Sequence, residues 1–513
     1  MIDVQKILYS KTNSFSKFIN DYLESKDNNN AEHISLPNIE DFEKQISEKK
    51  NHSINRNLLV DILLKQNKGI ALSKKSKSNI QSLRLENTFS VTTGHQLALF
   101  TGPLYVIYKI ISTINLCDQL NNKYGENKFV PIYWMATEDH DFNEINHINL
   151  FGEKIEWNSK QSGAVGKMQL DNFNKVILEL KKVLGSSTNS DKLIEIFESS
   201  YLRSKNLTDA TRTLFQEIFG RYGLVIIDGD CKDLKRIFIP FIKKDILYNG
   251  FVEAIKKSSS IFSKDYKQQV FVRDSNFFKL SRGKRELITE EITEREIDDF
   301  PHTFSPNVLL RPLYQEVVLP NIAYVGGGAE LSYWMQLKLA FKQEQIPFPA
   351  LVLRNSALIL SHKQSQKILK LGFKFSDIFL PLDDLKKQYV FSVSEKVISL
   401  DKEIEDISLI YKRIESKSND QSMQNSIQAM LQKQLSSIQS LQQKLIRLEK
   451  KNHEISINQI TNIKNSLFPN NTLQERHNNL SEYYFKYGDN FIEIIKSNFD
   501  PLNPNFVILT FKK

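Results

Sequence analysis

The residues best suited to chemistry fall into three short segments, and the densest of them lies after a strand-like apolar run. It places three carboxylates and an imidazole in consecutive positions, at Glu138, Asp139, His140 and Asp141. Such a cluster can hold an ammonium group or take a proton from an attacking amine. The spacing also allows a metal site, because His140, Glu144 and His147 would share one helical face. A structural role is the alternative, since Asp141 and Glu144 fit a capping box.

A second segment combines glycines with hydrogen-bonding side chains ahead of an apolar helix. Its members are Thr93, Gly94, His95, Gln96, Thr101 and Gly102. The glycines permit a tight turn, and Pro103 fits the first position of a helix predicted for residues 104–120. Free N–H groups at such a helix start favour a phosphate or a carboxylate. The spacing matches neither a Walker loop nor a dinucleotide fingerprint, so a plain turn capped by Thr101 is the alternative.

The third segment has consecutive glycines at a predicted strand end. Its candidate binding residues are Gly326, Gly327, Glu330 and Tyr333. Glycines in such a place let a ligand lie against the backbone. Glu330 can bind a hydroxyl or ammonium group, or it can simply favour the dipole of the next helix. Arg311 and Arg354 are further candidates, because a guanidinium group binds carboxylate and phosphate bidentately.

Composition excludes several classes of protein. The 513 residues include 40% hydrophobic and 25% charged residues, which is typical of a soluble globular chain with about three folding units. Two cysteines rule out a disulfide framework and a Cys-rich zinc or iron–sulfur site. The net charge of +9 is not gathered into long basic runs, so no nucleic acid partner is expected. No apolar run spans a bilayer and no signal peptide is recognisable, so we expect a cytoplasmic protein with no membrane partner.

The elements that must position these segments alternate between strand and helix. Helical runs separate strand-like runs at residues 89–93, 129–135, 224–227, 316–319 and 350–353. This order predicts an α/β fold with a Rossmann-like, doubly wound core, which binds ligands at the carboxyl ends of its strands. The predicted organisation is a helical segment over residues 1–88 and a core over 89–392, with helical insertions at about 151–221 and 255–305.

From about residue 393 the apolar residues follow alternating steps of three and four, which is typical of a coiled coil. The steps run from Val397 to Ile414 and resume from Ile427 to Leu448 after a polar break. We predict an antiparallel coiled-coil arm over residues 393–466, with one long imperfect helix as the alternative. Residues 467–513 should return to the core, with a strand at 506–510. Because the arm leaves apolar surface uncovered, a homodimer is expected.

Taken together and in this order, the motifs resemble the bacillithiol biosynthesis cysteine-adding enzyme family, also described as cysteine ligases. The likeness runs from residue 89 to the tail. It rests on Thr93-Gly-His-Gln96, Thr101-Gly-Pro-Leu-Tyr105 with Lys109, Ala136-Thr-Glu-Asp-His-Asp-Phe-Asn-Glu-Ile-Asn-His147, Arg311-Pro-Leu-Tyr-Gln315, Ala323-Tyr-Val-Gly-Gly327 with Glu330, and Leu473-Gln-Glu-Arg476. Two positions depart from the family: His95 stands where Gln is frequent, and Gly328-Ala329 replaces a common Pro-Gly.

The resemblance implies a ligase that joins the carboxyl group of L-cysteine to the amine of glucosaminyl-malate, the last step of bacillithiol biosynthesis. It implies use of ATP or ADP, with Mg²⁺ only as the nucleotide counter-ion and with no zinc or flavin. The turn from Gly94 to Pro103 would cradle phosphates, Glu138 to Asp141 would hold the cysteine ammonium or deprotonate the amine, and Arg311 would bind the malate carboxylates. The alternative is a nucleotidyltransferase or synthetase-like enzyme that activates an amino acid for another acceptor.

Overall fold

A five-stranded parallel sheet forms the centre of the core, in a computed structural model that describes residues 2–24, 35–281, 283–394, 399–503 and 505–512. In spatial order its strands are β11 (Ala350–Leu353), β10 (Asn321–Gly326), β2 (Thr88–His95), β3 (Lys128–Met135) and β6 (Val225–Asp228). The chain builds outward from β2 to β6 and then returns to add β10 and β11 on the other side. The predicted doubly wound core is confirmed, and its switch point lies between β2 and β10.

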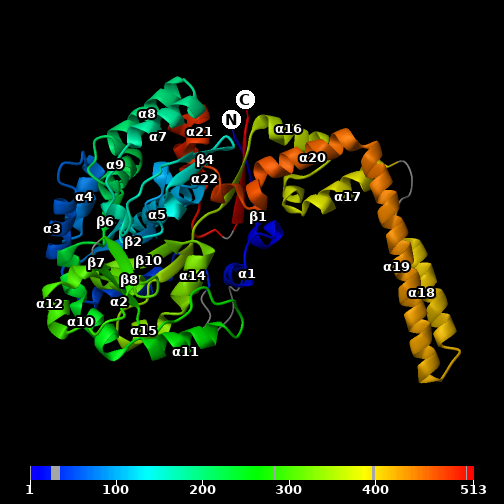
Figure 1. Ribbon diagram of the computed structural model, residues 1–513, viewed down its shortest axis with the longest axis horizontal. Helices are drawn as coiled ribbons and strands as arrows, with labels where there is room; N and C mark the ends of the chain where they lie inside the picture. Colours follow the sequence, from blue (N-terminus) through cyan, green and yellow to red (C-terminus); the bar gives the residue numbers. More distant parts are fainter. Residues whose placement is uncertain (1, 25–34, 282, 395–398, 504, 513) are drawn as a thin grey trace.

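Helices cover the sheet, whose strands are almost continuously buried, as expected for a parallel sheet (Figure 1). The helices of the core are α2 (Phe42–Lys50), α3 (Arg56–Gln66), α4 (Lys74–Ser82), α5 (Leu104–Lys123), α10 (Lys232–Tyr248), α11 (Val252–Phe262), α13 (Arg311–Val318), α14 (Gly328–Met335) and α15 (Lys338–Gln343). None of the helices in the described part of the chain is both long and apolar enough to cross a bilayer.

Two local predictions in the core are wrong. The strand predicted at residues 316–319 lies mostly in α13, and the strand follows Pro320 as β10. Pro312 at the start of α13 favours a helix, and the buried side chain of Glu316 finds a cationic partner in Lys49. The helix predicted for residues 331–341 is split into α14 and α15 around Gln336, whose amide donates to Ser259 Oγ at 2.8 Å.

Two insertions stand at the carboxyl edge of the sheet. The first contains α6 (Phe142–Ile145), β4 (His147–Leu150), β5 (Glu153–Glu156), α7 (Phe173–Leu184), α8 (Thr188–Tyr201) and α9 (Leu207–Phe219). The second contains α12 (Glu294–Asp299) and an antiparallel sheet of β7 (Phe277–Ser281), β8 (Lys284–Leu287) and β9 (Phe304–Pro306). The second insertion is therefore partly β-structure, whereas the sequence predicted helices.

The two ends of the chain meet in a separate three-stranded sheet (Figure 1). In it β13 (Asn505–Phe511) pairs antiparallel with β1 (Ile2–Leu8) and parallel with β12 (Ala357–Leu360). The terminal strand predicted at 506–510 is confirmed, but the helical segment predicted from residue 1 begins with a strand. Most of β1 is exposed on both faces, so it lacks the alternating pattern that would reveal a strand from sequence.

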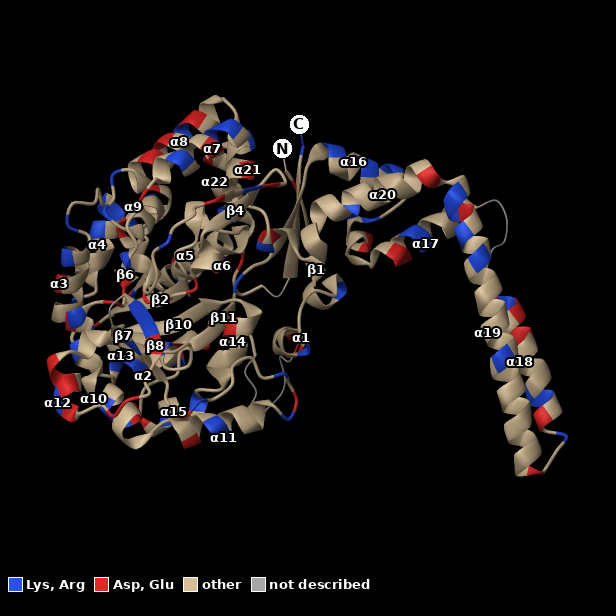
Figure 2. Cartoon of the chain, viewed as in Figure 1, with Lys and Arg blue, Asp and Glu red and all other residues tan. Residues whose placement is uncertain are grey.

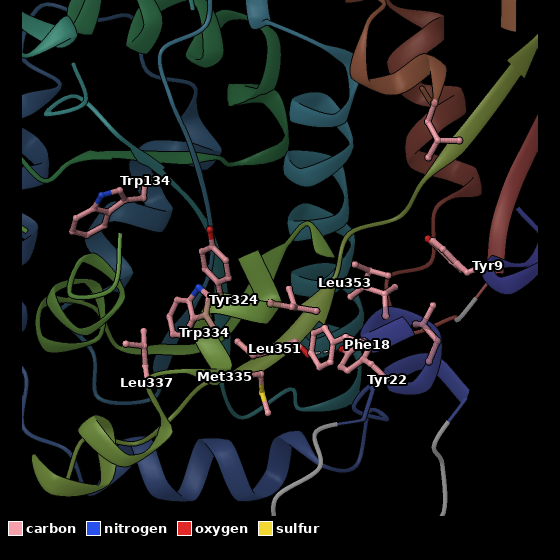
Figure 3. Close-up of a cluster of buried hydrophobic side chains, with 14 of the residues drawn as sticks. Tyr9, Phe18, Tyr22, Trp134, Tyr324, Trp334, Met335, Leu337, Leu351 and Leu353 are labelled. Atoms are coloured by element: carbon pink, nitrogen blue, oxygen red, sulfur yellow. Dashed lines mark hydrogen bonds between the residues drawn. The ribbon is translucent and has the colours of Figure 1, made fainter. Parts of the chain in front are cut away.

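Aromatic side chains from the N-terminal helix α1 (Lys17–Glu24) brace the back of the sheet near its switch point (Figure 3). The hydroxyl group of Tyr22 donates to the carbonyl of Leu351 in β11 at 2.7 Å. The rings of Tyr324 and Trp334 lie 4.7 Å apart and join β10 to α14. These contacts brace the elements on either side of the Gly326–Gly327 turn.

The C-terminal part of the chain carries the arm, which projects from the body (Figure 1). The helices of this part are α16 (His362–Lys370), α17 (Leu382–Val393), α18 (Asp401–Glu415), α19 (Gln421–Asn452) and α20 (Glu454–Leu467), followed by α21 (Leu480–Tyr487) and α22 (Asn490–Asn498), which return to the body. The chain turns between α18 and α19, which lie side by side as the predicted antiparallel coiled coil, so the single-helix alternative is wrong. Ile427 and Leu431 are buried in the seam, while Val397 lies outside the described residues.

Short 3₁₀ helices complete the fold. They are η1 (Tyr9–Thr12), η2 (Leu99–Thr101), η3 (Val165–Lys167), η4 (Gly220–Tyr222), η5 (Pro301–Thr303), η6 (Phe375–Phe379), η7 (Pro469–Asn471) and η8 (Gln474–Arg476).

The connection from β2 to α5 is covered by the C-terminal segment, which contradicts the anion cradle predicted there. The backbone N–H of Leu104 donates to the carbonyl of Asn478 at 2.9 Å. The side chain of Asn479 donates to the carbonyls of Phe100 and Gly102 at 2.8 and 2.7 Å. Thr101 is not a cap, since its buried hydroxyl has no partner among the described residues. The turn is therefore a packing element.

Gly102→Val should destabilise the protein without reporting on a ligand. Gly102 has φ +65°, and an added Cβ would lie 2.7 Å from the Cβ of Ala98. We expect a loss of roughly 3 kcal/mol or more in the free energy of unfolding, measured by urea denaturation. Thr101→Ala removes an unpaired hydroxyl and should change it by no more than about 1 kcal/mol. A Gly102→Val protein of wild-type stability would contradict this packing role.

Candidate functional site

A cavity of about 840 Å³ opens at the carboxyl edge of the central sheet, above the switch point between β2 and β10. The structure brings together residues from all three predicted segments in its wall. Those residues are Gly94, His95, Gln96, Glu138, Asp139, Arg311, Gly327, Glu330 and Tyr333. Their convergence follows from the topology, because parallel strands end at the same edge of the sheet.

The other predicted site residues lie outside the cavity wall, which corrects their assignment. The hydroxyl group of Thr93 donates to the carbonyl of Val325 at 2.7 Å and so joins β2 to β10. Gly326 is packed, since an added Cβ would lie 2.9 Å from the ring of Tyr324. The remaining four are Thr101 and Gly102, in the covered turn, and His140 and Asp141, which are exposed.

The metal site considered for His140, Glu144 and His147 is wrong, because these three residues do not share one helix. Helix α6 comprises only residues Phe142–Ile145, and His147 already begins β4. His140 precedes the helix and packs near the ring of Phe278 instead. The capping box considered for Asp141 and Glu144 is also wrong, because Asp141 makes no side-chain cap bond to α6.

An ion pair between the buried Lys109 and the partly exposed Glu330 lies in the middle of the site. The ammonium group of Lys109 also donates to the carbonyl of Gly94 at 2.9 Å. Glu330 accepts from the hydroxyl group of Tyr324 at 2.6 Å and from the N–H of Gly327 at 2.8 Å. Burial lowers the pKa of Lys109, and Glu330 only partly opposes this. Burial alone would raise the pKa of Glu330, but its ion pair and hydrogen bonds hold it below the ordinary value.

His95 is held as a neutral side chain. Its Nδ1 lies 3.0 Å from the carbonyl of Gln96, which can only accept, so Nδ1 carries the proton. Its Nε2 then accepts from the hydroxyl group of Tyr105 at 2.9 Å. Burial, reinforced by the charge of Lys109, lowers the pKa of His95 to about 4. A weakly basic ring with both nitrogens engaged is a poor candidate for a general base.

Two carboxylates on the β3 side of the cavity are joined by one amide. The side chain of Gln96 donates to Asp139 at 2.7 Å and to Glu144 at 2.9 Å. The other oxygen of Asp139 accepts from the N–H of His140 at 2.7 Å. These bonds fix the orientation of Asp139 in the wall.

Glu138 lines the cavity and also forms an ion pair with a buried cation. Lys235, whose side chain is completely buried, donates to Glu138 Oε1 at 2.5 Å and to the carbonyl of Phe304 at 2.6 Å. Burial raises the pKa of Glu138, while the charge of Lys235 opposes the rise. The sequence did not predict a role for Lys235, because its partner Glu138 lies far away in the chain, beyond the end of β3.

The arginines of the wall have donors left unused. Arg311 donates through Nη1 to Gln315 at 3.0 Å, and the side chain of Tyr333 interacts with its guanidinium group and favours the charged form, although the buried Nη2 meets no acceptor at full hydrogen-bond geometry among the described residues. Arg354 pairs with Glu475 at 2.6 Å, and its buried Nε is also unpartnered within the described chain. Lys109, Tyr105 and Arg476 complete this part of the wall. Sequence did offer a signal for Lys109, a lysine within an apolar helix.

The neutral state of His95 predicts a specific dependence of stability on pH. Its pKa of about 4 in the folded protein lies below the ordinary 6.5, so the unfolded chain binds an extra proton between these values. The contribution of neutral His95 to the free energy of unfolding is complete above pH 6.5 and is lost as the pH falls towards 4. The loss is at most about 3 kcal/mol. His95→Gln keeps an acceptor for Tyr105 and should lack this loss. Urea denaturation at pH 7 and pH 4.5 measures the difference, and equal losses in both proteins would contradict the assignment.

Known protein families and sequence relatives match almost the whole length of the chain. The family model for the N-terminal Rossmann-like domain of bacillithiol biosynthesis BshC matches residues 2–355, and the model for its C-terminal coiled-coil domain matches residues 357–511. A Flavobacterium psychrophilum protein named "Putative cysteine ligase BshC" is 42% identical over 530 residues and covers 98% of both chains. A protein of the same name from Flavobacterium johnsoniae is 40% identical over 98% of this chain and 99% of its own.

More distant proteins give weaker support for the family. A Bacillus cereus protein of the same name is 27% identical over 88% of this chain and 90% of its own. The structure of Plasmodium falciparum tryptophanyl-tRNA synthetase covers 90% of this chain and 97% of its own at 13% identity, but its TM-score of 0.20 supports no inference. The two matching family models and the end-to-end relatives agree with the Rossmann-like core and the coiled-coil arm, and the chain belongs to the BshC family of bacillithiol biosynthesis.

Proposed function

We propose that this protein is a ligase that forms an amide bond between the carboxyl group of L-cysteine and the amine of glucosaminyl-malate, as the last step of bacillithiol biosynthesis. The names of its relatives support cysteine as a substrate and the family supports the product. A cavity of about 840 Å³ has room for two small substrates side by side.

One observation carries the proposal: the cavity has a cationic side and an acidic side. Near β2, β10 and β11 its wall contains Lys109, Arg311, Arg354 and Arg476, of which Lys109 is paired with Glu330. Near the end of β3 it contains Glu138, Asp139 and Glu144, with Arg285 beside them. The cationic side suits the two carboxylates of malate, and the acidic side suits the ammonium groups of cysteine and glucosamine. The family match favours this ligase over the synthetase-like alternative.

The reaction requires an activated acyl group and a neutral amine. Asp139 would accept a proton from the glucosamine ammonium group, and the freed lone pair would attack the activated carbonyl carbon of cysteine. The activating group would then leave with one carboxyl oxygen. We propose ATP as its source, with Mg²⁺ as the counter-ion. The unpartnered guanidinium N–H groups fit a phosphate as well as a carboxylate, whereas the covered turn at Gly102 does not.

Incubation with cysteine, glucosaminyl-malate and ATP should yield a conjugate with the mass of the amide and a free thiol, seen by mass spectrometry. Chromatography of the nucleotides would identify the ATP product. Failure to form the conjugate with any nucleotide would refute the proposed reaction.

Asp139→Asn should lower turnover in the same assay by about 10²-fold or more, since it removes the proposed base. Melting should remain near normal, because Asn can still accept from the N–H of His140. Asp141→Asn is the matched control, as Asp141 is exposed and outside the cavity, and should keep wild-type turnover. Glu138→Gln is less informative because it leaves the buried charge of Lys235 without its partner. Wild-type turnover by Asp139→Asn would remove Asp139 from the mechanism.

We also propose that the arm pairs two copies of the chain and that the enzyme works in the cytoplasm, where cysteine and ATP are available. Helix α19 carries an apolar stripe made of Met423, Met430, Leu441 and Leu448, and each of these side chains is more than half exposed. Successive members are seven, eleven and seven residues apart, which places all four on one face of the helix. Figure 2 shows few charged residues on the outer half of α19. Such a stripe is typical of a surface buried by a partner.

Met430→Glu combined with Leu441→Glu should convert a dimer into a monomer in sedimentation velocity, because two charges would enter the proposed interface. Both side chains are exposed, so the fold of one copy should survive. Gln432→Glu, on the opposite face of α19, is the control and should remain dimeric. A dimer that persists in the double variant would place the interface elsewhere.

A further inference from the structure

We infer that Asp245, a carboxylate buried outside the cavity, is a positioning residue for Arg311 in the cavity wall. A chain of hydrogen bonds through Asn276 and Asn307 connects the two residues. The inference rests on the proposed function for the substrate that Arg311 meets. It adds to that function a residue that touches no substrate and acts through the start of α13.

Asp245 carries its charge in a place where a charge is unfavourable. It is completely buried in the last turn of α10, and no cation pairs with it among the described residues. Burial penalises a carboxylate, and the C-terminal end of a helix dipole repels it. Burial raises the pKa of Asp245, and hydrogen bonds from Asn276 oppose the rise. The charged form therefore depends on the hydrogen bonds that it accepts.

Both oxygens of this carboxylate accept from one asparagine. The backbone N–H of Asn276 donates to Oδ2 of Asp245 at 2.8 Å, and the Nδ2 of Asn276 donates to Oδ1 at 2.9 Å. The side-chain oxygen of Asn276 accepts in turn from Nδ2 of Asn307 at 3.0 Å. The backbones of the two asparagines are also joined, because the N–H of Asn307 donates to the carbonyl of Asn276 at 2.7 Å. The chain thus runs from α10 past the start of β7 to the end of β9.

Asn307 continues the chain into the first turn of α13. Its side-chain oxygen accepts from the N–H groups of Leu309 and Leu310 at 2.8 and 3.0 Å. Its backbone carbonyl accepts from the N–H of Arg311 at 2.9 Å. Asn307 thus satisfies three N–H groups at the start of α13, which lack carbonyl partners within the helix. Arg311 is the first residue of α13 and extends from this turn into the cavity wall.

The charge of Asp245 gives the chain a single direction. A carboxylate can only accept, so the NH₂ group of Asn276 must face Asp245 and its oxygen must face Asn307. The NH₂ group of Asn307 must then face Asn276, which leaves its oxygen for α13. An asparagine in place of Asp245 could donate as well as accept. Both amides could then turn around, and the start of α13 would lose its acceptor. We therefore expect the charge of Asp245, more than its shape, to hold Arg311 in place.

The test moves the charge from one partner to the other. Asp245→Asn should raise the reactivity of Arg311 towards phenylglyoxal, mapped by mass spectrometry in the full-length protein, because the guanidinium group is less firmly held. Arg354 in the same wall is the internal control, since it is held by a separate ion pair with Glu475. Asp245→Asn combined with Asn276→Asp restores one carboxylate facing one amide, so Arg311 should return to its wild-type reactivity.

Steady-state kinetics separate positioning from a purely structural role. In the conjugate assay, Asp245→Asn should raise KM for glucosaminyl-malate about tenfold and leave kcat within about threefold of the wild-type value. The reason is that Arg311 is proposed to bind the malate carboxylates, whereas the proposed base Asp139 is unchanged. The protein with both substitutions, Asp245→Asn and Asn276→Asp, should recover the wild-type KM. Lower stability alone would not change KM without changing kcat.

Asn307→Ala provides a second variant that leaves the bonds between Asp245 and Asn276 intact. It removes only the side-chain acceptor at the start of α13. It should raise the reactivity of Arg311 as Asp245→Asn does, and it carries the test if Asp245→Asn does not fold.

Wild-type reactivity of Arg311 in both Asp245→Asn and Asn307→Ala would overturn the inference. So would a doubly substituted protein that regains the wild-type melting temperature but neither the reactivity of Arg311 nor the KM. If the wild-type protein forms no conjugate, the proposed function fails, whereas the phenylglyoxal result still decides by itself whether Asp245 positions Arg311.

Discussion

The ion pair of the buried Lys109 with Glu330 is the interaction on which the rest of the site depends. It joins α5, which follows β2, to α14, which follows β10, and so bridges the point where the strand order reverses. Removing one partner of a buried pair typically costs about 3–5 kcal/mol, because the other charge stays desolvated. The pair therefore fixes two backbone turns, because Lys109 also donates to the carbonyl of Gly94 and Glu330 also accepts from the N–H of Gly327. The wall residues of these two turns are placed relative to this bridge.

Three further buried cations repeat this arrangement with partners from distant parts of the chain. Lys49 in α2 meets Glu316 in α13, Lys235 in α10 meets Glu138 beyond β3, and Arg354 beyond β11 meets Glu475 in η8. A buried charge needs a partner close by, and here the partner comes from another element each time. The ion pairs thus hold helices from both ends of the chain around one cavity and make its wall rigid.

The segment that returns from the arm links the arm to the cavity. Gln474 bonds the backbone of Ile359 in β12, Glu475 holds Arg354, and Arg476 lines the cavity. A few residues later, Asn478 and Asn479 close the start of α5. The C-terminal segment is therefore part of the wall although it lies more than a hundred residues beyond the core strands. This explains why the family's motifs continue past the coiled coil.

The sequence alone determined the local elements and the edge at which the site lies. The strand-like runs at β2, β3, β6 and β11, the glycine turns and the coiled-coil steps are local signals in the sequence, and parallel strands share one carboxyl edge. Tertiary structure decided the pairings. The strand β1 exists only through β13, residues 316–318 form a helix rather than a strand, and Thr101 and Gly102 are covered by Asn479 instead of facing a ligand. Lys235 and Arg354 acquire their roles from carboxylates distant in sequence, since buried charge is compensated through space and no local pattern records it.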